Sequence, residues 1–147
     1  MISTVERVLF LKAVDFFEEI PSELLIQVAR VAEEESFQTD ATLIAEGDEG
    51  DCLFLVVEGK VRVLFEGREL ARLGPKQCVG EMSLLDAEPR SASVIATEPT
   101  LCLRLDQEPF FDLLAEHPEL ARGLIGVLSR RLREMAHHER NRPRTLT

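Results

Sequence analysis

One short stretch of the sequence combines residue types that suit a phosphorylated sugar. It runs VGEMSLLDAEPRSAS from residue 79 to residue 93. Gly80 permits close approach of backbone at the head of a short helix expected over 81–85, and such a helix end attracts anions. Arg90 carries a guanidinium that matches two phosphate oxygens, and Ser91 adds a hydroxyl and an N–H. Glu81, an acceptor when ionised, suits a sugar hydroxyl, so the stretch predicts a pocket for a phosphate joined to a ribose.

The same residues also have simpler interpretations. Glu81 and Arg90 can form a structural ion pair, Gly80 can be an ordinary turn glycine, and Ser91 can serve tight packing. We favour the binding interpretation because the whole pattern surrounds these residues.

Strands are expected on both sides of this stretch. Short apolar runs alternate with turn pairs from Ser36 to Asp106, and the segment 61–73, with Glu66-Gly67 at its centre, predicts a hairpin. Six or more strands without long helices between them favour an antiparallel β jelly-roll barrel. The predicted fold class is therefore mainly β with flanking helices.

Helices are expected at both ends of the chain. Apolar spacing predicts one over 5–11, with Val5 and Leu9 on its apolar face, and a second from Pro21-Ser22 with the run 33–35 as its solvated end. Another follows Asp106, and the last runs from Pro118 to about His137. The expected apolar stripe of this last helix is Leu120, Leu124, Val127, Leu128, Leu132 and Met135.

Composition restricts the classes of function. The 147 residues fit one domain, and the net charge of −10 argues against nucleic-acid binding by the body of the protein. Three cysteines with no close pair suit reduced, buried thiols in a cytoplasmic protein. No apolar run is long enough to span a membrane, and no signal peptide is recognisable.

The run GEMSLLDAEPRSAS resembles the phosphate-binding cassette of cyclic nucleotide-binding domains. The family pattern is Gly-Glu, an aliphatic residue, a small residue, Leu, a spacer, Pro-Arg and two small residues, and each position is matched. The resemblance covers most of the chain, with residues 1–138 as the domain and 139–147 as a frayed basic tail.

The resemblance implies a role for each cassette residue. Arg90 would bind the exocyclic oxygens of the cyclic phosphate, and Glu81 would accept from the ribose 2′-hydroxyl. Backbone groups of the cassette would complete the site. The full set of ligand-binding candidates is Gly80, Glu81, Met82, Ser83, Arg90, Ser91, Ala92, Val63, Leu73, Arg131, Leu132 and Met135, of which Val63 and Leu73 would contact the base and the last three would cover it from the closing helix.

The resemblance further implies a regulatory module rather than an enzyme. Its ligand would be cAMP, or cGMP, because Ser91 can hydrogen-bond a guanine in some members; no metal or other cofactor is expected. Closure of the last helix would signal to an attached or partner domain. Met135 and Ala136 occupy the positions at which bacterial activators of the family have hydroxyl residues. This difference counts against base recognition and dimerisation of the kind those activators use. A homodimer through this helix stays an open alternative. The chain shows no helix-turn-helix after this helix, so specific DNA binding by this chain is not expected.

Two other functions compete with this interpretation, and each predicts a different feature. A domain that has lost its ligand and binds proteins would leave apolar residues of the last helix uncovered. A cupin-like enzyme would need His and carboxylate ligands inside the barrel, and no His lies between Ser36 and Asp106.

Overall fold

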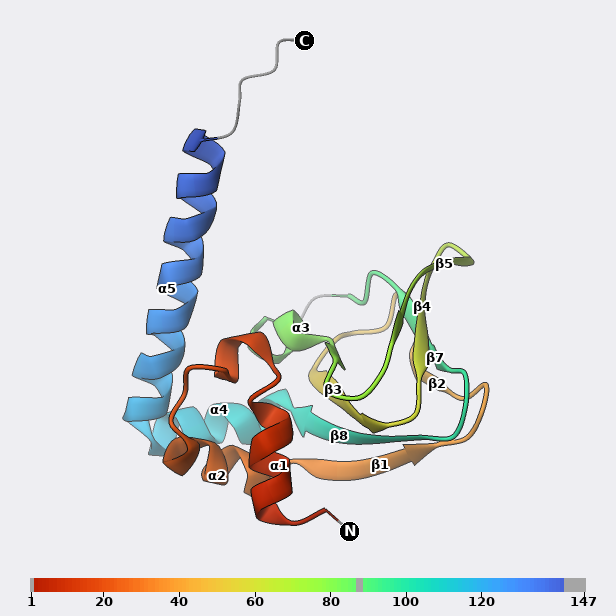
Figure 1. Cartoon of the computed structure of the whole chain (residues 1–147), viewed down its shortest axis with the longest axis horizontal. Coiled ribbons are helices and arrows are strands. Elements are labelled where there is room, and N and C mark those ends of the chain that lie inside the picture. Colours follow the sequence, from red (N-terminus) through yellow and green to blue (C-terminus); the bar gives the residue numbers. More distant parts are fainter. Residues whose placement is uncertain (1, 87–88, 142–147) are drawn as a thin grey trace.

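Helices flank two antiparallel sheets. The computed structural model describes residues 2–86 and 89–141 (Figure 1). Its helices are α1 (Thr4–Leu11), the 3-10 turn η1 (Asp15–Phe17), α2 (Ser22–Val31), α3 (Glu81–Leu85), α4 (Gln107–Glu116) and α5 (Pro118–Asn141). Its strands are β1 (Glu33–Phe37), β2 (Thr42–Ile44), β3 (Cys52–Glu58), β4 (Val61–Phe65), β5 (Arg68–Leu73), β6 (Cys78–Val79), β7 (Ser93–Ala96) and β8 (Thr100–Asp106). None of the helices in these ranges is long and apolar enough to cross a membrane.

The strands form two four-stranded sheets, in the orders β1-β8-β3-β6 and β2-β7-β4-β5. The predicted jelly-roll class is confirmed, as two sheets rather than a closed barrel. The predicted hairpin is also present: β4 pairs with β5 across a turn in which Glu66 and Gly67 both have positive φ. Positive φ at both central residues is the geometry that matches the right-handed twist of two paired strands.

The interpretation of the run 33–35 as a helix end is wrong. These residues begin β1, an edge strand that pairs with β8. Glu35 forms an ion pair with Arg104 at 3.4 Å, and Glu34 forms one with Arg7 at 3.5 Å. Charged side chains are common on edge strands because they discourage pairing with other chains.

Strand β3 is buried on both faces, because the sheet is covered by helices on one side and by the second sheet on the other. Leu53 and Leu55 belong to the core shared with the helices. Phe54 and Val56 belong to a second core between the sheets. A strand covered on both sides is apolar at nearly every position, as β3 is.

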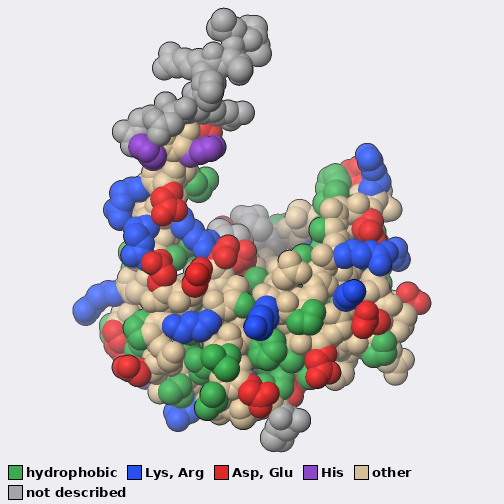
Figure 2. Space-filling view, in the orientation of Figure 1, with side chains coloured by type: hydrophobic (Ala, Val, Ile, Leu, Met, Phe, Trp, Pro, Cys, Tyr) green, Lys and Arg blue, Asp and Glu red, His purple; other side chains and the backbone are tan. Residues whose placement is uncertain are grey.

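Two helices bury less of their apolar residues than their spacing predicts. On α1, Val5 and Leu9 are 71% and 66% exposed. On α5, Ile125, Leu132 and Met135 are exposed as well, although the N-terminal part of the helix packs on the core. The C-terminal half of α5 stands away from the body of the protein, opposite the β4–β5 hairpin (Figure 1). The surface is hollowed between these two arms (Figure 2).

Candidate functional site

A cavity of about 430 Å³ lies where the second sheet meets the segment that contains α3. Seven of the predicted site residues line it: Val63, Gly80, Glu81, Ser83, Arg90, Ser91 and Ala92. Five lining residues were not predicted: Ile44, Val79, Asp86, Pro89 and Val94. Three of these five are strand residues with aliphatic side chains, and only the pairing of the strands shows that they face the same space.

Gly80 is required by the geometry of the site. Its φ is +82°, which favours glycine, and a Cβ at this position would lie 2.7 Å from the carbonyl oxygen of Cys52. It would also collide with Nη1 of Arg90. The glycine therefore provides both the turn into α3, which begins at Glu81 as predicted, and the space through which the Arg90 side chain passes.

Arg90 is held at both its backbone and its side chain. Its N–H donates to the Asp48 carbonyl at 2.7 Å, and its own carbonyl accepts from the Gly47 N–H at 2.9 Å. Nη1 donates to Ser83 Oγ at 2.9 Å, and Nη2 donates to the Cys52 carbonyl at 2.7 Å. Nη2 also lies 3.4 Å from Cys52 Sγ, so at least two of the five N–H donors of the guanidinium remain for an anion in the cavity that Arg90 lines.

Glu81 is not the ion-pair partner of Arg90. No ion pair joins these two described residues, and Arg90 bonds to Ser83 and Cys52 instead. The Oε2 atom of Glu81 is buried and has no hydrogen-bond partner among the described residues. A buried acceptor without a donor is costly, so this oxygen suits a ligand hydroxyl.

The electrostatic surroundings of Glu81 are set by its burial and by charges on two other elements, η1 and α5. Burial raises the pKa of its carboxyl above the ordinary value, and the negative charge of Asp15 on η1 raises it further. Arg131 on α5 acts in the opposite direction and lowers this pKa. Arg131 is itself paired with Asp15, its Nη2 lying 3.4 Å from Oδ2. The carboxylate of the cavity is thus coupled electrostatically to α5.

The remaining predicted site residues lie elsewhere or are only partly described. Leu73 packs partly buried against the core between the sheets, opposite Val61, and does not line the cavity. Arg131, Leu132 and Met135 lie on α5, and none of them lines the cavity either. Met82 is on α3, but its side chain is outside the described part of the structure. Whether these five residues contact a ligand stays a prediction.

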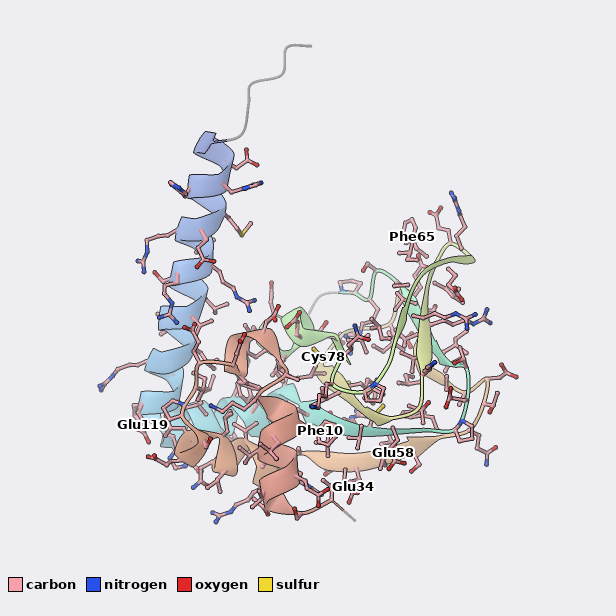
Figure 3. All side chains as sticks on the ribbon, in the orientation of Figure 1. Phe10, Glu34, Glu58, Phe65, Cys78 and Glu119 are labelled. Atoms are coloured by element: carbon pink, nitrogen blue, oxygen red, sulfur yellow. The ribbon has the colours of Figure 1, made fainter. Side chains whose placement is uncertain are left out.

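The two arms that flank the hollow both present apolar side chains. Phe65 lies near the tip of the β4–β5 hairpin and is 42% exposed (Figure 3). On the other arm Leu132 and Met135 are 66% and 64% exposed. The exposed apolar groups on α5 are the feature that the interaction-domain interpretation expects.

The three cysteines are free thiols; Cys52 and Cys102 are buried as predicted, whereas Cys78 is half-buried. Burial raises the pKa of Cys78 and of Cys102 to about 12, so both remain protonated at neutral pH. Cys78 lies on β6, beside α3 (Figure 3). Within residues 2–86 and 89–141, no cluster of His, Cys, Asp and Glu could hold a metal ion.

Comparison with known proteins identifies the family. Residues 34–117 match the model of the cyclic nucleotide-binding domain. The chain is 46% identical over 94 residues to the cyclic AMP receptor protein of Thermus thermophilus, which covers 60% of this chain and 44% of that protein. It is 34% identical over 131 residues to cGMP-dependent protein kinase isozyme 1 of Drosophila melanogaster, covering 84% of this chain and 17% of the kinase.

A solved structure shows the same arrangement of elements. The N-terminal domain of a transcriptional regulator from Streptomyces coelicolor superposes with a TM-score of 0.80 at 34% identity, covering 86% of this chain and 94% of that one. The chain spans about half the length or less of the curated relatives named above. Together with the matched cassette, these similarities show that the chain belongs to the cyclic nucleotide-binding domain family.

Proposed function

We propose that this regulatory domain binds cAMP in the cavity between α3 and the second sheet and reports its occupancy through α5. One observation carries the proposal: Arg90, which has unused donors, and Glu81, whose buried Oε2 has no partner, line the same cavity. A cyclic nucleotide supplies the complement of both, a phosphate anion and a ribose hydroxyl.

In this proposal the phosphate lies against Arg90. The fork of N–H donors suits two oxygens of the cyclic phosphate, and backbone N–H groups of Ser91 and Ala92 add donors nearby. The ribose 2′-hydroxyl donates to Glu81 Oε2, which gives that oxygen the partner it lacks. Each half of the ligand therefore satisfies a group that the fold leaves available.

The base would contact the aliphatic wall that Ile44, Val63 and Val94 contribute. The preference for cAMP rests on the similarity to a protein named as a cyclic AMP receptor. The competing ligand is cGMP, because the Ser91 hydroxyl lines the cavity and can bond a guanine, and because another relative is a cGMP-dependent kinase.

The signal would be a change in the position of α5. Its apolar residues Leu132 and Met135 gain burial if the helix moves over the hollow, and a ligand that contacts them stabilises that position. The helix is connected to the body by ion pairs of Arg130 with Glu19 and of Arg131 with Asp15. Closure would have to exchange or rearrange these pairs.

A second copy of the chain is the alternative cover for α5. Ile125, Leu128, Leu132 and Met135 follow each other at spacings of three and four residues, which is the pattern of a two-stranded coiled coil. This homodimer would also explain the exposed apolar face.

Several expectations stay predictions: the attached or partner domain that reads the signal, the cytoplasmic location, the lack of catalysis, the lack of specific DNA binding and the boundary at residue 138. The tail residues 142–147 lie outside the described residues.

A second candidate function is a protein-interaction domain without a ligand, which the exposed face of α5 favours. Calorimetric titration of the chain with cAMP, cGMP and the open nucleotide 5′-AMP separates the two functions. We expect the tightest binding for cAMP, near a Kd of about 1 μM, and none for 5′-AMP. If neither cyclic nucleotide gives heat or thermal stabilisation at millimolar concentration, the ligand-binding function is wrong and the interaction domain stands.

A further inference from the structure

The guanidinium of Arg90 is fixed by the protein before any nucleotide arrives. Ser83 Oγ accepts from Nη1 at 2.9 Å, on the side of α3. The Cys52 carbonyl accepts from Nη2 at 2.7 Å, on the side of β3. These two bonds come from different elements and hold both ends of the planar fork, so they define its plane as well as its position.

We infer that Ser83 is a positioning residue for the nucleotide phosphate. This inference rests on the proposed function and adds a role for a hydroxyl that acts through Arg90. The backbone of Arg90 is already tied to Asp48 and Gly47, so the freedom that remains lies in its long side chain. Ordering such a side chain on binding costs free energy, and a guanidinium held in advance avoids part of that cost.

Ser83 is itself well fixed. Its N–H donates to the Gly80 carbonyl at 3.0 Å within the short helix α3. Its carbonyl accepts from Nε2 of Gln107 at 3.4 Å, and Gln107 opens α4. The hydroxyl that orients Arg90 therefore belongs to a helix that is tied to the next helical layer. Because Ser83 is fixed in this way, its hydroxyl can hold the Arg90 guanidinium in one orientation.

The Cys52 carbonyl cannot replace the hydroxyl. It bonds Nη2 alone, and the Cys52 Sγ at 3.4 Å approaches the same nitrogen. Without Ser83 Oγ, nothing else among the described hydrogen bonds holds Nη1, and the fork can rotate about its bond to the side chain. We therefore expect loss of the hydroxyl to weaken phosphate binding while Arg90 and its charge remain.

The test compares Ser83→Ala with Ser83→Thr, which keeps the hydroxyl. We expect Ser83→Ala to weaken cAMP binding about tenfold and Ser83→Thr to stay within about twofold of the natural chain, as a bond to a charged group predicts. The same Ser83→Ala change is then made in an Arg90→Lys background, and the Kd for cAMP is measured in titrations that extend to millimolar nucleotide. An effect below about twofold there means that Ser83 acts through the guanidinium. An equal loss in both backgrounds means a direct contact with the ligand and overturns the inference.

A second measurement needs no nucleotide. The N–H signals of the Arg90 guanidinium are followed by NMR in the ligand-free chain, where restricted rotation keeps the two Nη groups distinct. We expect faster rotation in Ser83→Ala and the natural rate in Ser83→Thr. Unchanged rotation in Ser83→Ala overturns the positioning role. If the natural chain binds no nucleotide, the proposed function fails, but this measurement still decides whether Ser83 orients Arg90.

Discussion

The cassette and the C-terminal half of α5 both have clear sequence patterns, but the apolar side chains that give α5 its pattern are not packed against the body of the protein. Gly80, Ser83 and Arg90 contact one another or the neighbouring backbone and line one cavity. Leu132 and Met135 have the spacing of a buried stripe and are nevertheless exposed. In the proposed function the cassette is arranged for a ligand before it binds, whereas the exposed face of α5 would be covered by closure on that ligand or by a second molecule.

The largest effect is expected at Gly80. In Gly80→Ala the new methyl group collides with Arg90 and the Cys52 carbonyl, so we expect nucleotide binding to be lost. The matched control is Gly67→Ala, which has a similar φ of +79° but no atom within 4 Å of the added Cβ. The control should lose about 1 kcal/mol of stability and keep its affinity. Equal affinities of the two variants in calorimetry would show that the space above residue 80 has no importance for the site.

Glu81→Gln should weaken binding by about tenfold or more, because a neutral amide replaces the charged acceptor of the 2′-hydroxyl. The loss should be absent with 2′-deoxy-cAMP, which has no hydroxyl to donate. Titration of both variants with both nucleotides measures this coupling. If the variant loses the same factor for the deoxy ligand, Glu81 does not contact the ribose.

The raised pKa of Glu81 predicts two effects of pH. Since the folded state disfavours the charged carboxylate, the stability that this group contributes is present below its unfolded-state pKa and is lost as pH rises through its raised folded-state pKa. At pH 7 ligand-free Glu81→Gln should therefore melt above the natural chain. Nucleotide affinity should have the opposite dependence and fall as the pH is lowered. The fall should occur at a higher pH than it would for a glutamate with an ordinary pKa. Arg131→Ala should move that fall to a still higher pH, because Arg131 lowers this pKa. Thermal melts and titrations from pH 4 to pH 8 follow both effects. If the affinity falls at the same acidic pH with and without Arg131, the electrostatic coupling of Glu81 to Arg131 is disproved.

The smallest effect is expected on α5. Replacing Leu132 and Met135 by serine removes apolar area that closure would bury, so affinity should fall by several fold, within about tenfold. Val5→Ser is the control, because Val5 is just as exposed but lies on α1. Light scattering on the same variants reports self-association. A loss of dimer without a change in affinity would assign the face of α5 to a second copy instead of to closure.

Features that depend on local signals could be predicted from the sequence, whereas contacts between distant residues could not. The cassette helix over 81–85 and the hairpin over 61–73 were predicted correctly because each depends on local signals, such as the glycine turns at 67 and 80. The run 33–35 was misassigned because its pairing with β8 joins residues about seventy positions apart. The hydrogen bond from Arg90 to the Cys52 carbonyl was not predictable either, since every residue has a backbone carbonyl and its position does not depend on residue type. For α5, spacing identified an apolar face but not the molecule that covers it.

Titration of cAMP into the natural chain, into Arg90→Ala and into Arg68→Ala tests whether the nucleotide phosphate binds at Arg90. Arg68 is exposed on β5, outside the cavity, so its removal changes the net charge of the protein by the same amount. We expect binding near 1 μM, about −8 kcal/mol, for the natural chain and for Arg68→Ala. Arg90→Ala should bind at least about a hundredfold more weakly, as expected when a bonded charge is removed from its partner. Equal affinities of Arg90→Ala and Arg68→Ala would mean that the phosphate binds somewhere other than this cavity and that the proposed site is wrong.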